Sequence, residues 1–221
     1  MDDGERRLTG RCSRRSPTVG RCAASLWRPR LNASTLAELA DHSCGPHMIP
    51  RTRNEAVQLL ADVGAPPRLR RHAELVGEAA ETLLLGFRKL GVPLEAEFVR
   101  VGVVLHDVGK SLHPSELDAP GAAHEPAGER LLLERGVSAE VARVCRSHAQ
   151  WRDVAETLEE LVIALADKLW KGARVVELEE LVIERASAAA GRNRWDLFTE
   201  LDAMFERVAS EADSRLGRSV V

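Results

Sequence analysis

The chain has 221 residues and a formal net charge of −3, with 44% hydrophobic residues, 4% aromatic residues and no Tyr. This length fits one domain with a substantial core, the small charge gives no argument for nucleic-acid binding, and no apolar stretch approaches the ~20 residues needed to cross a bilayer. Because aromatic residues are scarce, the core must consist of Leu, Val and Ala, which favours helices over sheets.

The first 47 residues differ in composition from the rest. They hold eight Arg and five acidic residues, whereas residues 48–221 hold 23 basic and 29 acidic residues. Arg, Ser, Pro and Gly recur here without an apolar period, which predicts a disordered extension. Three of the four cysteines also lie in this segment, so no disulfide framework is expected, and neither is secretion, since an apolar signal segment is missing. We therefore expect a cytoplasmic protein with one domain at 48–221; an alternative is that translation begins at Met48.

Helical signals follow one another through that domain. Apolar residues recur at intervals of three and four, and no alternating strand pattern competes with them. A Pro- and Gly-rich loop is expected over Ser111–Ala123. The sequence thus predicts an all-α bundle, with helices over Arg53–Val63, Pro67–Leu90, Leu94–Leu105, His124–Arg135, Ser138–Gln150, Val154–Lys171, Val175–Ala190 and Arg194–Leu216.

Histidine and aspartate residues occupy particular places in these helices. His72 shares the apolar face of its helix, and His106 with Asp107 ends the next apolar helix. His124 begins a predicted helix, and His148 lies at the end of another. Asp167 interrupts the apolar run LVIALAD. A carboxylate within an apolar run is costly to bury unless a cation compensates for its charge.

Imidazole nitrogens and carboxylate oxygens suit Zn, Mn, Fe, Co or Ni. Four His and two Asp exceed the needs of one tetrahedral site. They match two metals about 3.5–4 Å apart that share a bridging carboxylate, an arrangement used to hydrolyse phosphate esters. The sequence therefore predicts a binuclear metal site at the centre of the bundle.

These residues resemble those of the HD-domain superfamily of metal-dependent phosphohydrolases. The resemblance rests on RRHAELVGEAA, VLHDVGK, HEPAGERLLLERGV, RSHAQW and ALADKLW, which give the order H…HD…H…H…D over about residues 68–172. It implies that His72, His106, Asp107 and Asp167 hold one metal. By the same resemblance, His124, His148 and the bridging Asp107 hold the second.

The resemblance also implies an activity. Lys110 of HDVGK would contact a substrate phosphate, and a hydroxide at the bridged metals would attack phosphorus. The substrate would be a phosphomonoester or phosphodiester, with a nucleotide expected. The chain lacks the GYP signature of the cyclic-di-GMP branch, so that substrate is not carried over. An ED pair like that of the ppGpp hydrolases cannot be located in this sequence either, although Glu116 and Asp118 lie in the corresponding region.

Other readings remain open at this point. A di-iron oxygenase of the same fold would use the same ligands, and a regulatory module could bind a nucleotide without turnover. Asp167 could instead form a structural ion pair with Lys168 or Arg174. Five basic residues could frame an electropositive mouth or simply lie on solvated faces: Arg143, Arg146, Lys168, Lys171 and Arg174. We expect core packing for Trp151 and Trp170, a small buried role for Cys145 and an exposed loop position for His113.

Overall fold

The structure is a computed structural model that describes residues 49–220, and this part of the chain contains helices and no strand. The predicted all-α class is thereby confirmed. The predicted disordered extension over residues 1–47 lies outside the described residues. The domain boundary at residue 48 stays a prediction.

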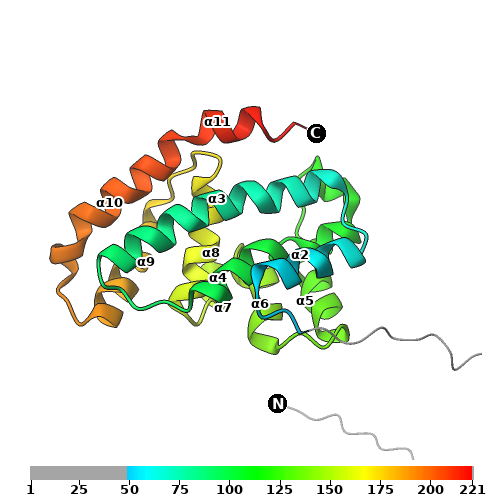
Figure 1. Cartoon of the computed structure of the whole chain (residues 1–221), viewed down its shortest axis with the longest axis horizontal. Coiled ribbons are helices and arrows are strands. Elements are labelled where there is room, and N and C mark those ends of the chain that lie inside the picture. The colour runs from blue at the N-terminus through cyan, green and yellow to red at the C-terminus, as the bar shows by residue number, and fades with distance from the viewer. Residues whose placement is uncertain (1–48, 221) are drawn as a thin grey trace, which may run out of the picture. The chain divides into compact units, whose positions relative to one another are not determined.

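The described residues contain ten α-helices and two short 3-10 helices. In chain order they are α2 (Arg53–Asp62), α3 (Pro67–Lys89), α4 (Ala96–Leu105), η1 (Val108–Ser111), η2 (Pro114–Leu117), α5 (His124–Glu134), α6 (Ala139–Ser147), α7 (Trp151–Val154), α8 (Leu158–Leu169), α9 (Val176–Ala190), α10 (Arg194–Ser210) and α11 (Ala212–Gly217). Figure 1 shows the long α3 crossing the helical unit, with α10 and α11 following one side of it.

Local sequence signals explain where several helices begin and end. Thr52 starts α2 with a capping box, in which its side chain accepts from the Glu55 amide and the Glu55 carboxylate accepts from the Thr52 amide. Thr157 starts α8 in the same way. Pro67 occupies the first turn of α3, where its missing N–H costs nothing, and Gly91 follows that helix with a φ of 72°.

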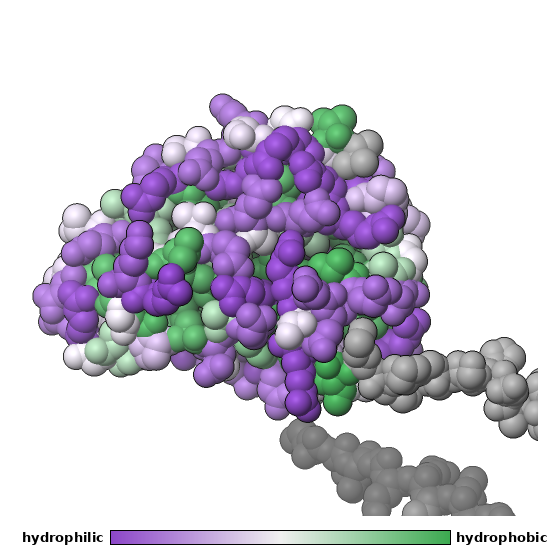
Figure 2. Space-filling model, in the orientation of Figure 1, coloured by the Kyte–Doolittle hydropathy of each residue, from purple (hydrophilic) through white to green (hydrophobic). Residues whose placement is uncertain are grey.

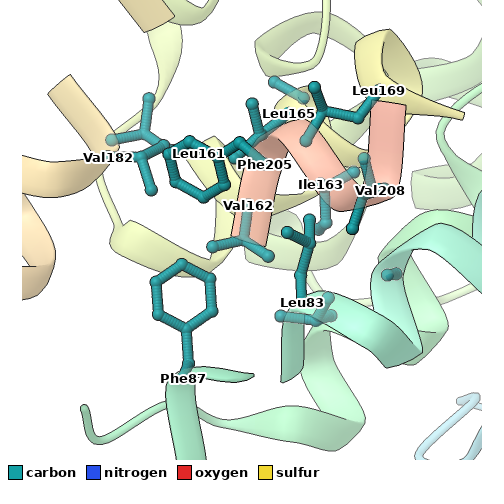
Figure 3. Close-up of a cluster of buried hydrophobic side chains, with 14 of the residues drawn as sticks. Leu83, Phe87, Leu161, Val162, Ile163, Leu165, Leu169, Val182, Phe205 and Val208 are labelled. Atoms are coloured by element: carbon teal, nitrogen blue, oxygen red, sulfur yellow. The ribbon is translucent and has the colours of Figure 1, made fainter. Parts of the chain in front are cut away.

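The larger hydrophobic core surrounds α8. Leu83 and Phe87 of α3 face Val162 and Ile163 of α8, and Phe205 of α10 joins the same cluster (Figure 3). All five side chains are buried. Burial of this kind contributes roughly 1.5–3 kcal/mol per large apolar side chain, so α8 is held firmly between α3 and α10.

The fourth helix connects this core to a smaller one. Val99 and Val103 of α4 belong to the larger cluster, whereas Val101, Val104 and Leu105 belong to the second cluster with α2, α5 and α6. Helix α4 is therefore buried on most of its circumference, which explains its nearly continuous apolar sequence. The residues that follow Leu105 consequently begin inside the protein.

One predicted helix ends earlier than expected, and the next one begins later. The helix predicted over Ser138–Gln150 ends at Ser147, and Trp151–Val154 forms the separate α7. The helix predicted from Val154 begins only at Leu158, because Ala155 is extended and Thr157 caps α8.

Two further boundaries differ from the prediction. The helix predicted over Arg194–Leu216 breaks at Glu211 into α10 and α11, and the break lets Arg215 donate to the Val208 carbonyl. The predicted loop Ser111–Ala123 contains η2 rather than being irregular throughout.

The face drawn in Figure 2 is mainly hydrophilic, with separate apolar areas between charged residues. Among the described helices, none combines the length and the apolar character that a membrane span requires.

Candidate metal centre

The turn after α4 places Asp107 opposite α5. His106 caps α4, and the backbone changes direction at Asp107 to enter η1. Gly109 makes this possible, because a Cβ there would lie 1.9 Å from the His124 carbonyl oxygen and 2.7 Å from the Gly128 nitrogen. Without side chains at these glycines, η1 packs directly on the backbone of α5 and brings Asp107 close to His124.

One oxygen of Asp107 faces a first group of ligand atoms. Its Oδ2 lies 3.2 Å from His72 Nε2 and 3.6 Å from His106 Nε2. Asp167 completes this group, because its Oδ1 lies 3.6 Å from His72 Nε2 and 3.7 Å from His106 Nε2. Three helices, α3, α4 and α8, thus bring four potential ligands together, and the atoms of His72, His106 and Asp167 lie close enough to hold one ion.

The other oxygen of Asp107 faces a second group. Its Oδ1 lies 3.1 Å from His124 Nε2 and 3.5 Å from His148 Nε2. Both histidines are buried, His124 at the start of α5 and His148 at the end of α6. The six residues predicted as ligands are therefore all gathered around Asp107, whose two oxygens point to different histidine groups.

The hydrogen bonds of the rings fix how the histidines meet Asp107. His106 Nδ1 donates to the Val103 carbonyl at 2.8 Å, and His148 Nδ1 donates to the Val144 carbonyl at 3.1 Å. In a neutral ring, Nε2 then carries a lone pair directed at the carboxylate. Lone pairs and a buried carboxylate repel each other unless a cation lies between them. Consistently, Asp107 Oδ1 has no hydrogen-bond donor among the described residues, so the donor set fits metal ions.

Glu116 orients the ring of His124. Its carboxylate accepts from His124 Nδ1 at 2.5 Å, from the His124 amide at 3.1 Å and from the Ala123 amide at 3.2 Å. A carboxylate behind an imidazole fixes the tautomer that leaves Nε2 free for a metal. This role of Glu116 is not predictable from the sequence, because the contact depends on how the loop between η2 and α5 folds.

The protonation of the site follows from these contacts. Burial opposes the ionisation of Asp107 and Asp167, yet neighbouring His side chains hold the pKa of each carboxyl well below its usual range. Burial lowers the pKa of His124, but the carboxylates of Asp107 and Glu116 beside its ring outweigh burial and raise that pKa above its ordinary value. Both aspartates are thus negatively charged and available to a cation.

A cavity of about 620 Å³ opens onto these residues. Lys110 and Lys168 line it, with Lys110 Nζ 2.5 Å from Asp107 Oδ2 and Lys168 Nζ 2.9 Å from Asp167 Oδ2. Asp167 therefore has the structural ion pair with Lys168 that was considered as an alternative, in addition to its place beside the histidines. An anion that enters the cavity meets both ammonium groups.

The other predicted basic residues divide into two groups. Lys171, like Lys168, lines the cavity. The three arginines do not line it and instead form ion pairs: Arg143 with Glu160, Arg146 with Glu129, and Arg174 with Glu179. Of the five basic residues that could surround the cavity entrance, only Lys168 and Lys171 therefore line the cavity. The three arginines form ion pairs with residues of the helices instead.

The remaining predicted residues lie as follows. Trp170 packs on the core and also lines the cavity, with its ring 5.1 Å from the His72 ring between centroids, whereas Trp151 does not line it. Cys145 is buried as expected, and burial raises its pKa well above the ordinary value. His113 is half-buried rather than exposed, since it precedes η2, and it does not line the cavity.

Comparison with known proteins gives a match to one family model. Residues 69–170, just under half of the chain, match the model of the HD domain. The chain is also 29% identical over 137 residues to an uncharacterized protein of Methanocaldococcus jannaschii, an alignment that covers 55% of this chain and 77% of the relative. No solved structure matches. The matched segment contains all six residues gathered around Asp107, whereas α9, α10 and α11 lie outside it.

Proposed function

We propose, from the premise that residues 69–170 belong to the HD-domain superfamily of metal-dependent phosphohydrolases, that this chain hydrolyses a phosphate ester at a binuclear metal centre. One observation carries the proposal. The two oxygens of Asp107 face separate histidine groups, with His72 and His106 at Oδ2 and His124 and His148 at Oδ1. A bridging carboxylate between two cations requires this division.

The residues present define which groups would hold the metals. His72, His106, Asp107 and Asp167 would hold one ion. His124, His148 and the shared Asp107 would hold the second. Such a pair of ions supplies a hydroxide nucleophile near neutral pH and polarises the phosphoryl oxygen. The ligand types suit Mn, Fe, Co, Ni or Zn.

The protein side chains supply the rest of the chemistry. Lys110 and Lys168 both line the cavity beside the metal ligands, so their ammonium groups would bind the nonbridging oxygens of a substrate phosphate. Each lysine also contacts an aspartate of the site, Asp107 or Asp167, and this contact fixes the position of its charge. Charges fixed before the substrate binds need little reorganisation as the transition state forms.

The size of the cavity supports a nucleotide-sized substrate. A volume of about 620 Å³ lies in the range of sites that enclose small organic ligands, roughly 300–1,000 Å³. We therefore propose a phosphomonoester or phosphodiester of a nucleotide as the substrate class.

The test compares metal content and turnover in the wild type, Asp107→Ala and Lys110→Ala. Wild type is expected to bind about two metal ions per chain and to hydrolyse members of a nucleotide and phosphodiester panel. Asp107→Ala should lose metal and turnover, whereas Lys110→Ala should keep its metal and lose turnover. Asp153→Ala, at an exposed position on α7, is the matched control and should behave as wild type.

Two results would contradict the proposal. Metal-loaded wild type without hydrolysis across the panel, together with iron and oxygen-dependent turnover, would assign the site to an oxygenase. Folded wild type that binds no metal would remove the binuclear centre altogether and leave a nucleotide-binding module.

A further inference from the structure

The last helix is fixed to the end of α8 by a buried arginine. Arg215 of α11 is 2% exposed. Its guanidinium donates to the carbonyls of Val208 at 2.8 Å and Trp170 at 3.3 Å, and it pairs with Glu211 at 2.8 Å. Trp170 follows α8 directly and lines the cavity. Arg215 therefore fixes α11, and the residues that follow it, close to this side of the cavity.

The residues that follow are attached to α3. The Arg218 guanidinium forms two hydrogen bonds with the Glu78 carboxylate, at 2.7 Å and 2.6 Å. The Arg218 carbonyl also accepts from Arg71 Nε at 2.8 Å, and Arg71 directly precedes His72. Figure 1 shows this end of the described chain beside the first half of α3. Ser219 and Val220 are therefore held beside the helix that carries His72.

These contacts place two residues in the cavity wall. Ser219 and Val220 line the same cavity as the residues around Asp107. Val220 is 87% exposed. The segment that carries it is nevertheless held in place by the hydrogen bonds of Arg215 and of Arg218. An apolar side chain that lines a cavity and is not packed into the core is accessible to a ligand in that cavity.

The cavity also has apolar lining residues. They come from separate segments and include Leu117, Trp170 and Val220. Two arginines beside this wall are already neutralised, since Arg68 pairs with Asp118 and Arg218 pairs with Glu78. This part of the cavity therefore suits an uncharged group with an apolar face.

We propose that the segment Arg218–Val220 is a specificity-determining part of the substrate site and contacts the organic portion of a phosphate ester. The inference rests on the proposed function, and it selects an organic phosphate ester over inorganic polyphosphate as the substrate. The segment lies outside the residues that match the HD domain. Selection by this wall is thus a property of this chain that the metal ligands do not determine.

Binding measurements separate this inference from turnover. The affinities of metal-loaded protein for the 5′-phosphonate analogue of adenosine monophosphate, whose P–C bond is not hydrolysed, and for inorganic phosphate are measured by calorimetry in wild type, Val220→Ser and Leu216→Ser. Wild type should prefer the nucleotide, and Val220→Ser should reduce that preference by roughly threefold to tenfold with phosphate affinity unchanged. Leu216, on α11 and outside the cavity wall, provides the matched control, which should keep the wild-type preference.

A charge exchange tests the attachment of the segment. Glu78→Arg and Arg218→Glu should each reduce the nucleotide preference, because like charges then meet at α3, and the double exchange should restore it. A purely structural pair would change the melting temperature without changing the ratio of the two affinities. An unchanged ratio in Val220→Ser, or a wild type without preference, would overturn the inference. Nucleotide preference without hydrolysis would refute the proposed function alone.

Discussion

Glu116 offers a selective way to disturb one half of the proposed centre. Its carboxylate accepts from the ring and the amide of His124 and from the amide of Ala123. These hydrogen bonds of Glu116 go to Ala123 and His124 and do not involve His72 or Asp167. Replacing Glu116 with Ala should therefore release the His124 ring while the first group of ligands keeps its geometry.

The magnitude follows from the contacts that are lost. Removal of a group that orients a metal-bound histidine costs about 10–100-fold in metal affinity, which equals roughly 1.4–2.8 kcal/mol. The Glu116 carboxylate makes three hydrogen bonds, one of them to the histidine ring itself, so we expect the upper part of this range. Glu116→Gln should fall between Ala and wild type, because the amide oxygen still accepts from one donor.

Metal titration of the metal-free protein by calorimetry, with metal content after dialysis as a second measurement, gives the two affinities. Wild type should show two binding events, and Glu116→Ala should weaken only one of them. Asp118→Ala is the matched control, since Asp118 lies in the same loop, pairs with Arg68 and does not contact His124. Equal weakening of both events, or no weakening, would refute the argument that Glu116 serves the His124 half of the site.

Two further variants test the packing around the site and the electrostatics of the fold. Gly109→Ala should lower the free energy of unfolding by about 1–3 kcal/mol or more, because its Cβ would meet backbone atoms of α5. Gly217→Ala is the control and should change the free energy of unfolding little, because no atom lies within 4 Å of its Cβ. Similar urea-denaturation midpoints for the two variants would contradict the close packing of η1 on α5. Burial opposes the ionisation of Glu160, but hydrogen bonds from Arg143 outweigh it and hold the Glu160 pKa below 4.5. Glu160→Gln should therefore cost roughly 1.5–3 kcal/mol at pH 7. This difference should shrink only as the pH falls below 4.5, because the unfolded chain then takes up a proton before the folded carboxylate does. A difference that is constant from pH 7 to pH 3 in urea titrations would contradict the ion pair.

Much of the fold could be predicted because its signals are local. Apolar spacing, Pro67 and Gly91 located α3 to within one residue of its observed end, and the apolar run before His106 located the end of α4. The break at Glu211 could not be found in this way. It depends on Arg215 reaching the Val208 and Trp170 carbonyls, and Trp170 is 45 residues away in sequence.

The candidate site, too, could be predicted only in part from the sequence. The histidines and aspartates could be chosen from the sequence because a polar residue in an apolar helix requires a compensating partner. Their assignment as metal ligands stays a prediction that the experiments above address. The contribution of Glu116 and the position of Val220 were not predicted, since both depend on loops whose path is set by tertiary contacts rather than by periodicity.

The position of Val220 in the cavity wall has a practical consequence for handling the protein. A polyhistidine tag placed shortly after Val220 would start close to that wall. Its imidazoles would be tethered near the aspartates and histidines around Asp107, where a short flexible linker gives an effective concentration in the millimolar range. Such a tag would compete with the native histidines for added metal and distort any stoichiometry. Purification should therefore use an amino-terminal tag that is cleaved before metal is added.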